Sequence, residues 1–321
     1  MGRDSKIEWT DATWNPIRGC SRISSGCDHC YAESVAARFS GPGQAYEGLA
    51  EFRTHGAGTE NERVEPHWTG KIRFVEPHLR DPLKWNEPLR VFVNSMSDLF
   101  HPGVTSEMLG EIFHVMAKAP QHTYQILTKR PERMFEALEA GGAPHVAEAF
   151  ENTYGQKWPP PNWFFGVSIE DQETANRRLP ILARCRCAKR MVSYEPAIGP
   201  VDFTEAMGGD PRAVLAFDWI IVGGESGHRA RPMHPQWARE VRDLCKQLGI
   251  AFFFKQWGEF VPGASIKGFC QWPDISSNRS VLMPAHPGRP GRDLHQIMIR
   301  VGKHRAGAAL DDVESKEFPQ C

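Results

Sequence analysis

The chain has 321 residues and carries 38 Lys and Arg against 39 Asp and Glu, a formal net charge of −1. This balance excludes an attraction to nucleic acid or membrane spread over the whole chain, so any basic surface must be local. The composition, 40% hydrophobic and 24% charged, is that of a globular protein and excludes a wholly disordered, collagen-like or coiled-coil chain.

No stretch reaches the ~18 consecutive apolar residues that a membrane helix needs. Polar Glu8 and Thr10 stand where a secretory signal would place its apolar segment. We therefore expect a soluble, cytoplasmic protein without a membrane partner. In that compartment the eight cysteines are not expected to form disulfides.

Short apolar runs separated by turns and helical patterns predict strands that alternate with helices. A first strand is predicted within residues 12–17, where Pro16 disfavours regular pairing. The later runs follow one another at intervals of roughly 26–40 residues, the length of a strand–helix unit. These six strands are predicted at residues 90–94, 123–127, 163–167, 190–194, 219–222 and 250–254.

Helical patterns fall between these strands. Residues 105–118 begin at Thr105, a suitable N-cap, while residues 131–138 and 235–248 begin with proline and are followed by glycine. The alternation predicts an α/β fold, a complete or partial parallel βα (TIM-like) barrel with its chemistry on the loops after the strands. We expect the barrel to cover residues 1–261 and a C-terminal extension, residues 262–321, to pack on it.

Three cysteines form the most specific feature of the sequence. Cys20, Cys27 and Cys30 lie in one loop, after the first predicted strand and before a helical pattern that starts at Tyr31. The close pair directs two thiolates at one centre, and the longer spacing lets the third close round it. Three thiolates leave one iron of a cubane cluster open to a further ligand.

Two alternatives to a cluster remain open at this point. A structural zinc normally takes four ligands, and His29 is badly placed between Cys27 and Cys30 to supply the fourth. The second alternative is a set of buried cysteines without a metal. Cys185 and Cys187, one residue apart, could ligate an auxiliary centre or be ordinary cysteines.

The strand, cysteine loop and helix resemble the start of radical S-adenosylmethionine (SAM) enzymes, whose usual spacing is C-x3-C-x2-C with an aromatic or imidazole residue before the last cysteine. His29 fills that place, while six residues instead of three separate Cys20 from Cys27. The wider pattern is similar to a phage-associated family of radical-SAM-like proteins. It includes residues 14–20, 27–33, 94–98, 127–131, 166–168, 223–227, 254–258, 300–303 and 317–319.

This resemblance implies a 4Fe–4S cluster on Cys20, Cys27 and Cys30 that binds SAM and cleaves it to a 5′-deoxyadenosyl radical. It also implies a flavodoxin- or ferredoxin-like reductant as a partner. The substrate does not follow from the resemblance. A zinc- or cluster-stabilised nucleic-acid-binding protein without radical chemistry is the alternative function.

Polar residues follow each predicted strand, and in a barrel they would lie at one mouth. Carboxylates, amides, cations and glycines of this kind suit a zwitterionic adenosyl ligand. The expected cofactor-binding residues are Asn94, Ser95, Asp98, Ser168, Glu170, Glu195, Gly223, Gly224 and Glu225.

Cations follow three of the strands, and the segment from Arg289 to Arg305 is locally basic. Guanidinium groups pair well with phosphate oxygens, which predicts a nucleotide or nucleic-acid substrate. The expected substrate-binding residues are Lys129, Arg130, His228, Arg229, Arg231 and Lys255.

Overall fold

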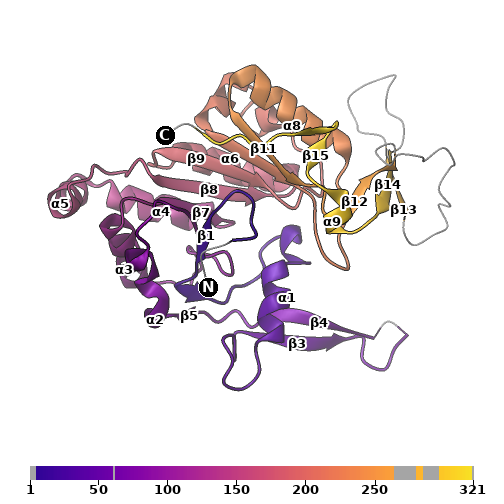
Figure 1. Ribbon diagram of the computed structural model, residues 1–321, viewed down its shortest axis with the longest axis horizontal. Helices are drawn as coiled ribbons and strands as arrows, with labels where there is room; N and C mark the ends of the chain where they lie inside the picture. The colour runs from indigo at the N-terminus through magenta and orange to yellow at the C-terminus, as the bar shows by residue number, and fades with distance from the viewer. Residues whose placement is uncertain (1–4, 61, 264–279, 285–295, 320–321) are drawn as a thin grey trace. The chain divides into compact units, whose positions relative to one another are not determined.

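The computed structural model describes residues 5–60, 62–263, 280–284 and 296–319 (Figure 1). Seven parallel strands form one sheet in the order β1-β6-β7-β8-β9-β10-β11, which confirms the predicted α/β fold with a partial TIM-like barrel. The strands are β1 (Ala12–Trp14), β6 (Arg90–Val93), β7 (Thr123–Thr128), β8 (Trp163–Ile169), β9 (Lys189–Tyr194), β10 (Trp219–Gly223) and β11 (Ala251–Gln256).

The first strand is shorter than predicted. β1 pairs with β6 from Ala12 opposite Val91 to Trp14 opposite Val93 and then stops. Pro16 cannot donate a hydrogen bond to a neighbouring strand, so pairing with β6 ends before it. The chain resumes as the short strand β2 (Ile17–Arg18), which pairs with β5 (Arg73–Phe74) in an antiparallel direction.

The three predicted helices are confirmed. The Thr105 hydroxyl caps α3 (Ser106–Lys118) by accepting a hydrogen bond from the Met108 amide. The helix α4 (Pro131–Gly141) extends a few residues past its predicted end, and α8 (Pro235–Leu248) stops where Gly249 adopts a φ of 70°. Two further helices, α5 (Pro144–Tyr154) and α6 (Gln172–Arg184), were not predicted.

The chain divides into two compact units, residues 1–167 with 181–191 and 321, and residues 168–180 with 192–320. The division expected at residue 261 stays a prediction.

No helix among the described residues is both long and apolar enough to span a membrane. The remaining short elements of the first unit are η1 (Ser25–Cys27), α2 (Glu76–Leu79) and η2 (Asp81–Lys84).

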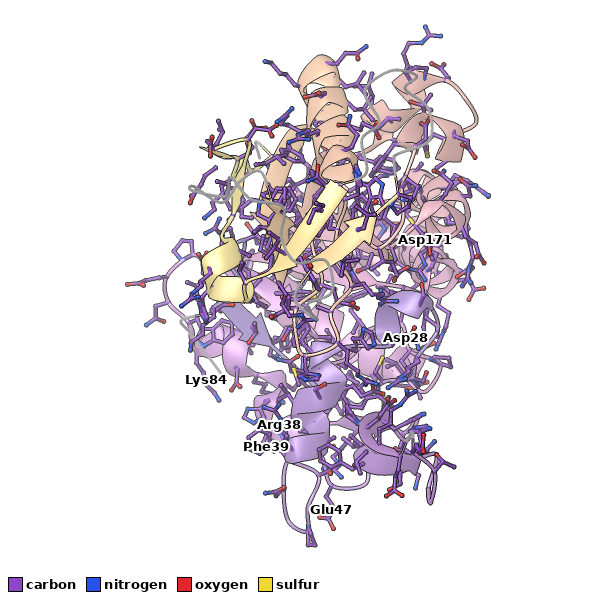
Figure 2. The ribbon with its side chains drawn as sticks, turned by 90° about the vertical axis from the view of Figure 1, so that its right-hand side faces the viewer. Asp28, Arg38, Phe39, Glu47, Lys84 and Asp171 are labelled. Atoms are coloured by element: carbon purple, nitrogen blue, oxygen red, sulfur yellow. The ribbon has the colours of Figure 1, made fainter. Side chains whose placement is uncertain are left out.

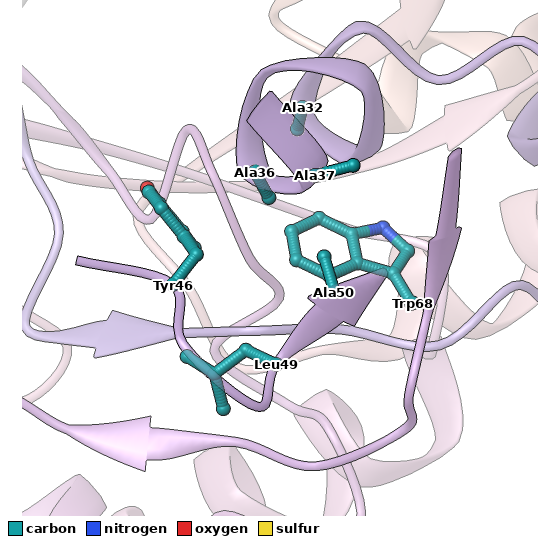
Figure 3. Packing of buried hydrophobic residues seen from close by; sticks show 7 residues of the cluster. All are labelled: Ala32, Ala36, Ala37, Tyr46, Leu49, Ala50 and Trp68. Atoms are coloured by element: carbon teal, nitrogen blue, oxygen red, sulfur yellow. The ribbon is translucent and has the colours of Figure 1, made fainter. Parts of the chain in front are cut away.

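A small side core in the first unit joins a helix to a hairpin (Figures 1 and 3). The helix α1 (Tyr31–Arg38) packs on the antiparallel pair β3 (Ala50–His55) and β4 (Arg63–Trp68). The alanines of α1 allow the close approach of Trp68. Figure 2 shows Arg38 and Phe39 at the end of this helix. The core consists of Ala32, Ala36, Ala37, Tyr46, Leu49, Ala50 and Trp68, against which Cys20 and Cys30 also pack.

The second unit carries the last strands of the large sheet and a small antiparallel sheet. In this small sheet β14 (Gln296–Arg300) lies between β12 (Phe260–Pro262) and β13 (Ser280–Met283). The other elements of this unit are α7 (Phe203–Ala206), η3 (Pro211–Ala216), α9 (Lys303–Ala306), β15 (Ala309–Leu310) and β16 (Val313–Glu314).

Candidate functional site

The three-cysteine loop runs from β2 to α1 in the first unit. Gly19 opens it with a φ of +90°, and a side chain at this position would lie 2.2 Å from the Lys71 carbonyl oxygen, so only glycine fits. Cys27 closes the 3-10 turn η1, and Cys30 occupies the N-cap position of α1. The loop is therefore bounded by a close backbone approach on one side and a helix start on the other.

None of the described cysteines, the three of the loop included, forms a disulfide. Burial raises the pKa of Cys20 to about 12 and raises that of Cys30, and nearby thiolate charge adds to both shifts: Cys30 acts on Cys20, and Cys27 acts on Cys30. The thiols are thus close enough to interact electrostatically. A metal that binds them would have to displace their protons.

The arrangement differs from that of a single metal ion. Among the residues that the structure describes, no three His, Cys, Asp or Glu side chains are grouped so that they could hold one ion. A cubane cluster binds each thiolate at a different iron, so its ligands stand farther apart than those of one zinc. The loop supplies the three thiols that a cubane with one open iron would need.

A buried ion pair anchors the residue after Cys20. The Arg130 Nη1 atom lies 2.7 Å from Asp98 Oδ2 and 3.9 Å from the Cys20 sulfur, and Nη2 donates to the carbonyl and hydroxyl oxygens of Ser21, each at 2.9 Å. Arg130 is only 7% exposed, so these contacts are shielded from water. The pair connects the start of α4 with the cysteine loop.

The Asp98 carboxylate is fully engaged. Its Oδ1 atom accepts from the Thr128 hydroxyl at 2.7 Å and from the Phe100 amide at 2.9 Å. Its Oδ2 atom accepts from the Lys129 amide at 3.3 Å as well as from Arg130. The predicted site residue Asp98 therefore holds the ends of β6 and β7 together around Arg130.

His101 completes this anchor as a neutral imidazole. Burial and the charge of Arg130 lower the pKa of His101 to about 4. Because Nδ1 accepts from the Gly103 amide at 3.1 Å, Nε2 carries the proton and donates to the Ser21 hydroxyl at 2.9 Å. Ser21 is thus held by Arg130 and His101 together.

A second anchor holds Arg22. Its guanidinium group forms an ion pair of 2.6 Å with Glu33, which is completely buried in α1, and donates to the Pro66 carbonyl at 3.0 Å. Glu33 also accepts from the Trp68 amide at 2.7 Å. The loop, the helix after it and the root of the hairpin are therefore joined through one carboxylate.

The predicted residues after β6 lie next to the loop. Asn94 has a φ of 60°, and its Oδ1 atom accepts from the Ile17 amide at 3.3 Å. Its buried Nδ2 atom has no hydrogen-bond partner in the described structure. The Ser95 carbonyl oxygen accepts a hydrogen bond of 2.6 Å from the hydroxyl of Tyr31, the residue that follows Cys30. A bound ligand or a water molecule would satisfy the Asn94 Nδ2 donor.

In the second unit, two predicted cofactor-binding carboxylates are paired with arginines. Glu170 and Arg178 are both fully buried and lie 3.0 Å apart, and Arg178 also donates to the Ser168 carbonyl at 2.6 Å. Glu225 forms a bidentate pair with Arg231 at 2.6 and 2.9 Å. These two ion pairs therefore stabilise the segments that follow β8 and β10.

Four other predicted residues lie at neighbouring strand ends of the same unit. The Lys255 Nζ atom lies 2.9 Å from Glu195 Oε1. A side chain at Gly223 would overlap this carboxylate, and one at Gly224 would lie 2.0 Å from the Trp257 carbonyl oxygen. Both glycines are therefore required by close packing at the ends of β10 and β11.

The basic residues His228 and Arg229 are exposed on the loop that follows β10. Arg300, at the end of β14, donates to the Gly227 and Ala230 carbonyls at 3.4 and 3.2 Å and so fastens this loop. The exposed cations of α9 come directly after Arg300 in the chain; they are Lys303, His304 and Arg305. Arg289 and Arg292 lie outside the described residues.

Cys185 and Cys187 lie in the first unit, where both are buried, and burial raises the pKa of Cys185 to about 12.

The sequence reasoning missed several residues that the structure brings to the loop. Glu33 and Arg22 lie within or beside the cysteine motif, so their opposite charges were a usable signal. Nothing in the sequence marked Ser21, His101 or Thr128 at the loop, or Arg178, the partner of Glu170 in the second unit.

The model of the family described as "Protein of unknown function (DUF5131)" matches residues 4–319. None of the curated proteins matches the chain significantly. Among solved structures, the chain is similar to two variants of spore photoproduct lyase, one of them with bound AdoMet and dinucleoside spore photoproduct. Each has 12% identity and a TM-score of 0.41, with 94% of this chain and 71% of the other chain covered.

Proposed function

The chain belongs to the DUF5131 family, and we propose that it is a radical-SAM-type enzyme whose Cys20, Cys27 and Cys30 hold a 4Fe–4S cluster. The observation that carries this proposal is the cysteine loop itself. It presents three free thiols between a strand and a helix, and buried ion pairs fix it through Ser21 and Arg22. Such anchoring positions ligands before the cofactor arrives.

A cluster held by Cys20, Cys27 and Cys30 would supply the one-electron reduction by which SAM is cleaved to methionine and a 5′-deoxyadenosyl radical. The chain's own residues hold the thiolates, exclude water and orient the ligand. Asn94 and Ser95 are proposed to contact SAM, since the Asn94 Nδ2 donor is buried and lacks a partner in the described structure. The cofactor-binding roles expected for Ser168, Glu195, Gly223 and Gly224 stay predictions.

The proposal is tested by anaerobic reconstitution of the full chain with iron and sulfide. About four irons and four sulfides per chain support the cluster, whereas a single zinc favours the nucleic-acid-binding alternative. Dithionite and SAM are then added, and 5′-deoxyadenosine is measured by mass spectrometry. A fully loaded cluster that produces no 5′-deoxyadenosine would contradict the enzymatic proposal.

For the substrate we propose a phosphate-bearing molecule, a nucleotide or nucleic acid. Support comes from the second unit, where Arg300 fastens the loop that carries His228 and Arg229 and leads into the basic helix α9. Arg231 and Lys255 are paired with carboxylates. Arg229 is exposed on this loop and Arg305 on α9, so we assign phosphate contact first to these two. The roles of Lys129, His228, Arg231 and Lys255 stay predictions.

Replacing both Arg229 and Arg305 with alanine is expected to weaken binding of short DNA and RNA oligomers. Each lost phosphate contact should reduce the slope of log K against log salt by about 1, so the double variant should lose about 2. Fluorescence anisotropy over a salt series measures this. Arg212→Ala is the matched control, because Arg212 is also exposed in this unit and lies on a different segment. Wild-type protein that binds neither oligomer at low salt would refute the phosphate proposal.

A further inference from the structure

Arg130 is an unusual residue for the position at which it stands. It follows β7 and immediately precedes α4, where a positive charge is unfavourable to the helix dipole. It is nevertheless buried, and both of its terminal nitrogens are occupied by Asp98, Ser21 and Cys20. A guanidinium group committed in this way has no donor at Nη1 or Nη2 left over for a substrate phosphate.

The contact of Arg130 with Cys20 is electrostatic as well as geometric. Nη1 lies 3.9 Å from the sulfur, within the range of a hydrogen bond to sulfur, and the guanidinium charge favours the thiolate while the Asp98 charge opposes it. Arginine keeps its charge at all physiological pH values. The Cys20 sulfur therefore faces one carboxylate and one permanent cation, whose effects on the thiolate are opposite.

We infer that Arg130 is a positioning residue of the three-cysteine loop, which fixes the Cys20 sulfur and sets the reduction potential of the cluster. The inference rests on the proposed function. Reduction adds one electron from a low-potential donor to the cluster, whose charge falls from 2+ to 1+, and no bond or proton is exchanged. A cation beside a ligand stabilises the more negative, reduced form and so raises the potential, whereas Asp98 lowers it.

The test compares the midpoint potentials of the reconstituted full chain and its variants, measured by an anaerobic redox titration followed by electron paramagnetic resonance. Arg130→Gln should make the potential more negative, and Asp98→Asn should make it more positive. Each substitution is expected to change the equilibrium constant between reduced and oxidised cluster about tenfold. For a one-electron couple this corresponds to a shift of about 59 mV in the midpoint potential. Opposite shifts distinguish a charge effect from loosening of the loop, which would move both variants in the same direction.

Arg186→Gln is the control for loss of an arginine–carboxylate pair, because Arg186 pairs with Glu139 at the surface and should leave the potential unchanged. If Arg130→Gln assembles no cluster, Arg130→Lys keeps the charge and should give a potential close to the wild type. This inference alone would be overturned if the midpoint potential were the same in the wild type, Asp98→Asn and the Arg130 variants. It would also be overturned if the potentials of the variants shifted with the same sign. Wild-type protein that assembles no cluster would overturn the proposed function, and this inference with it.

Discussion

Replacing Cys27 with alanine is expected to abolish both the brown absorbance of the cluster and the formation of 5′-deoxyadenosine. A cubane that loses one of three thiolate ligands keeps two, which do not retain it against chelation or oxidation. Cys27 is the best choice of the three, because it lies on a partly exposed turn outside the core that packs against Cys20 and Cys30. The iron content, the visible spectrum and mass spectrometry measure the loss.

Cys245→Ala provides the matched control. Cys245 is a fully buried free thiol of α8, far along the chain from the loop, and burial raises its pKa to about 12. This variant should keep its iron and its activity. A Cys27→Ala protein with the iron content and activity of the wild type would show that the cysteine motif does not hold a cluster.

Replacing Arg178 with methionine is expected to lower the free energy of unfolding by about 3–5 kcal/mol, the usual cost of removing one partner of a buried ion pair. The Glu170 carboxylate would remain fully buried without its guanidinium partner. Urea unfolding followed by circular dichroism measures the loss. In Arg178→Met/Glu170→Met both charges are gone, so most of the stability should return. A loss below about 1 kcal/mol in Arg178→Met would show that water reaches Glu170.

The strands of the large sheet were predictable because parallel strands are buried on both faces and read as continuous apolar runs. Residues 219–222 and 250–254 are clear examples, and both became strands. The helix α6 was missed, since it contains Pro180 and many polar residues. The hairpin β3–β4 was missed because half of its strand residues are exposed, so packing did not impose an alternating pattern on them.

The candidate site was predictable only where its members are close in sequence. The spacing of the cysteines places them on one loop before a helix, which the structure reproduces. The partners of Ser21 come from the segments that follow β6 and β7, many residues away, and no local pattern marks them. Lys129 and Arg130 were interpreted as one basic pair, yet the turn after β7 buries Arg130 and leaves Lys129 partly exposed. Tertiary contacts alone decide which of two neighbouring cations meets the loop.

The two ends of the hairpin β3–β4 differ in their contacts: its root is the end where Ala50 pairs with Trp68, and its tip is the end where His55 pairs with Arg63. At its root, Trp68 and Pro66 are tied through Glu33 and Arg22 to the cysteine loop. The described residues between His55 and Arg63 are all exposed, so they make no such connection. Exposed hairpin tips of this kind accept inserted residues more readily than packed roots do. A spectroscopic label or affinity tag placed at the tip would therefore leave the cysteine ligands untouched.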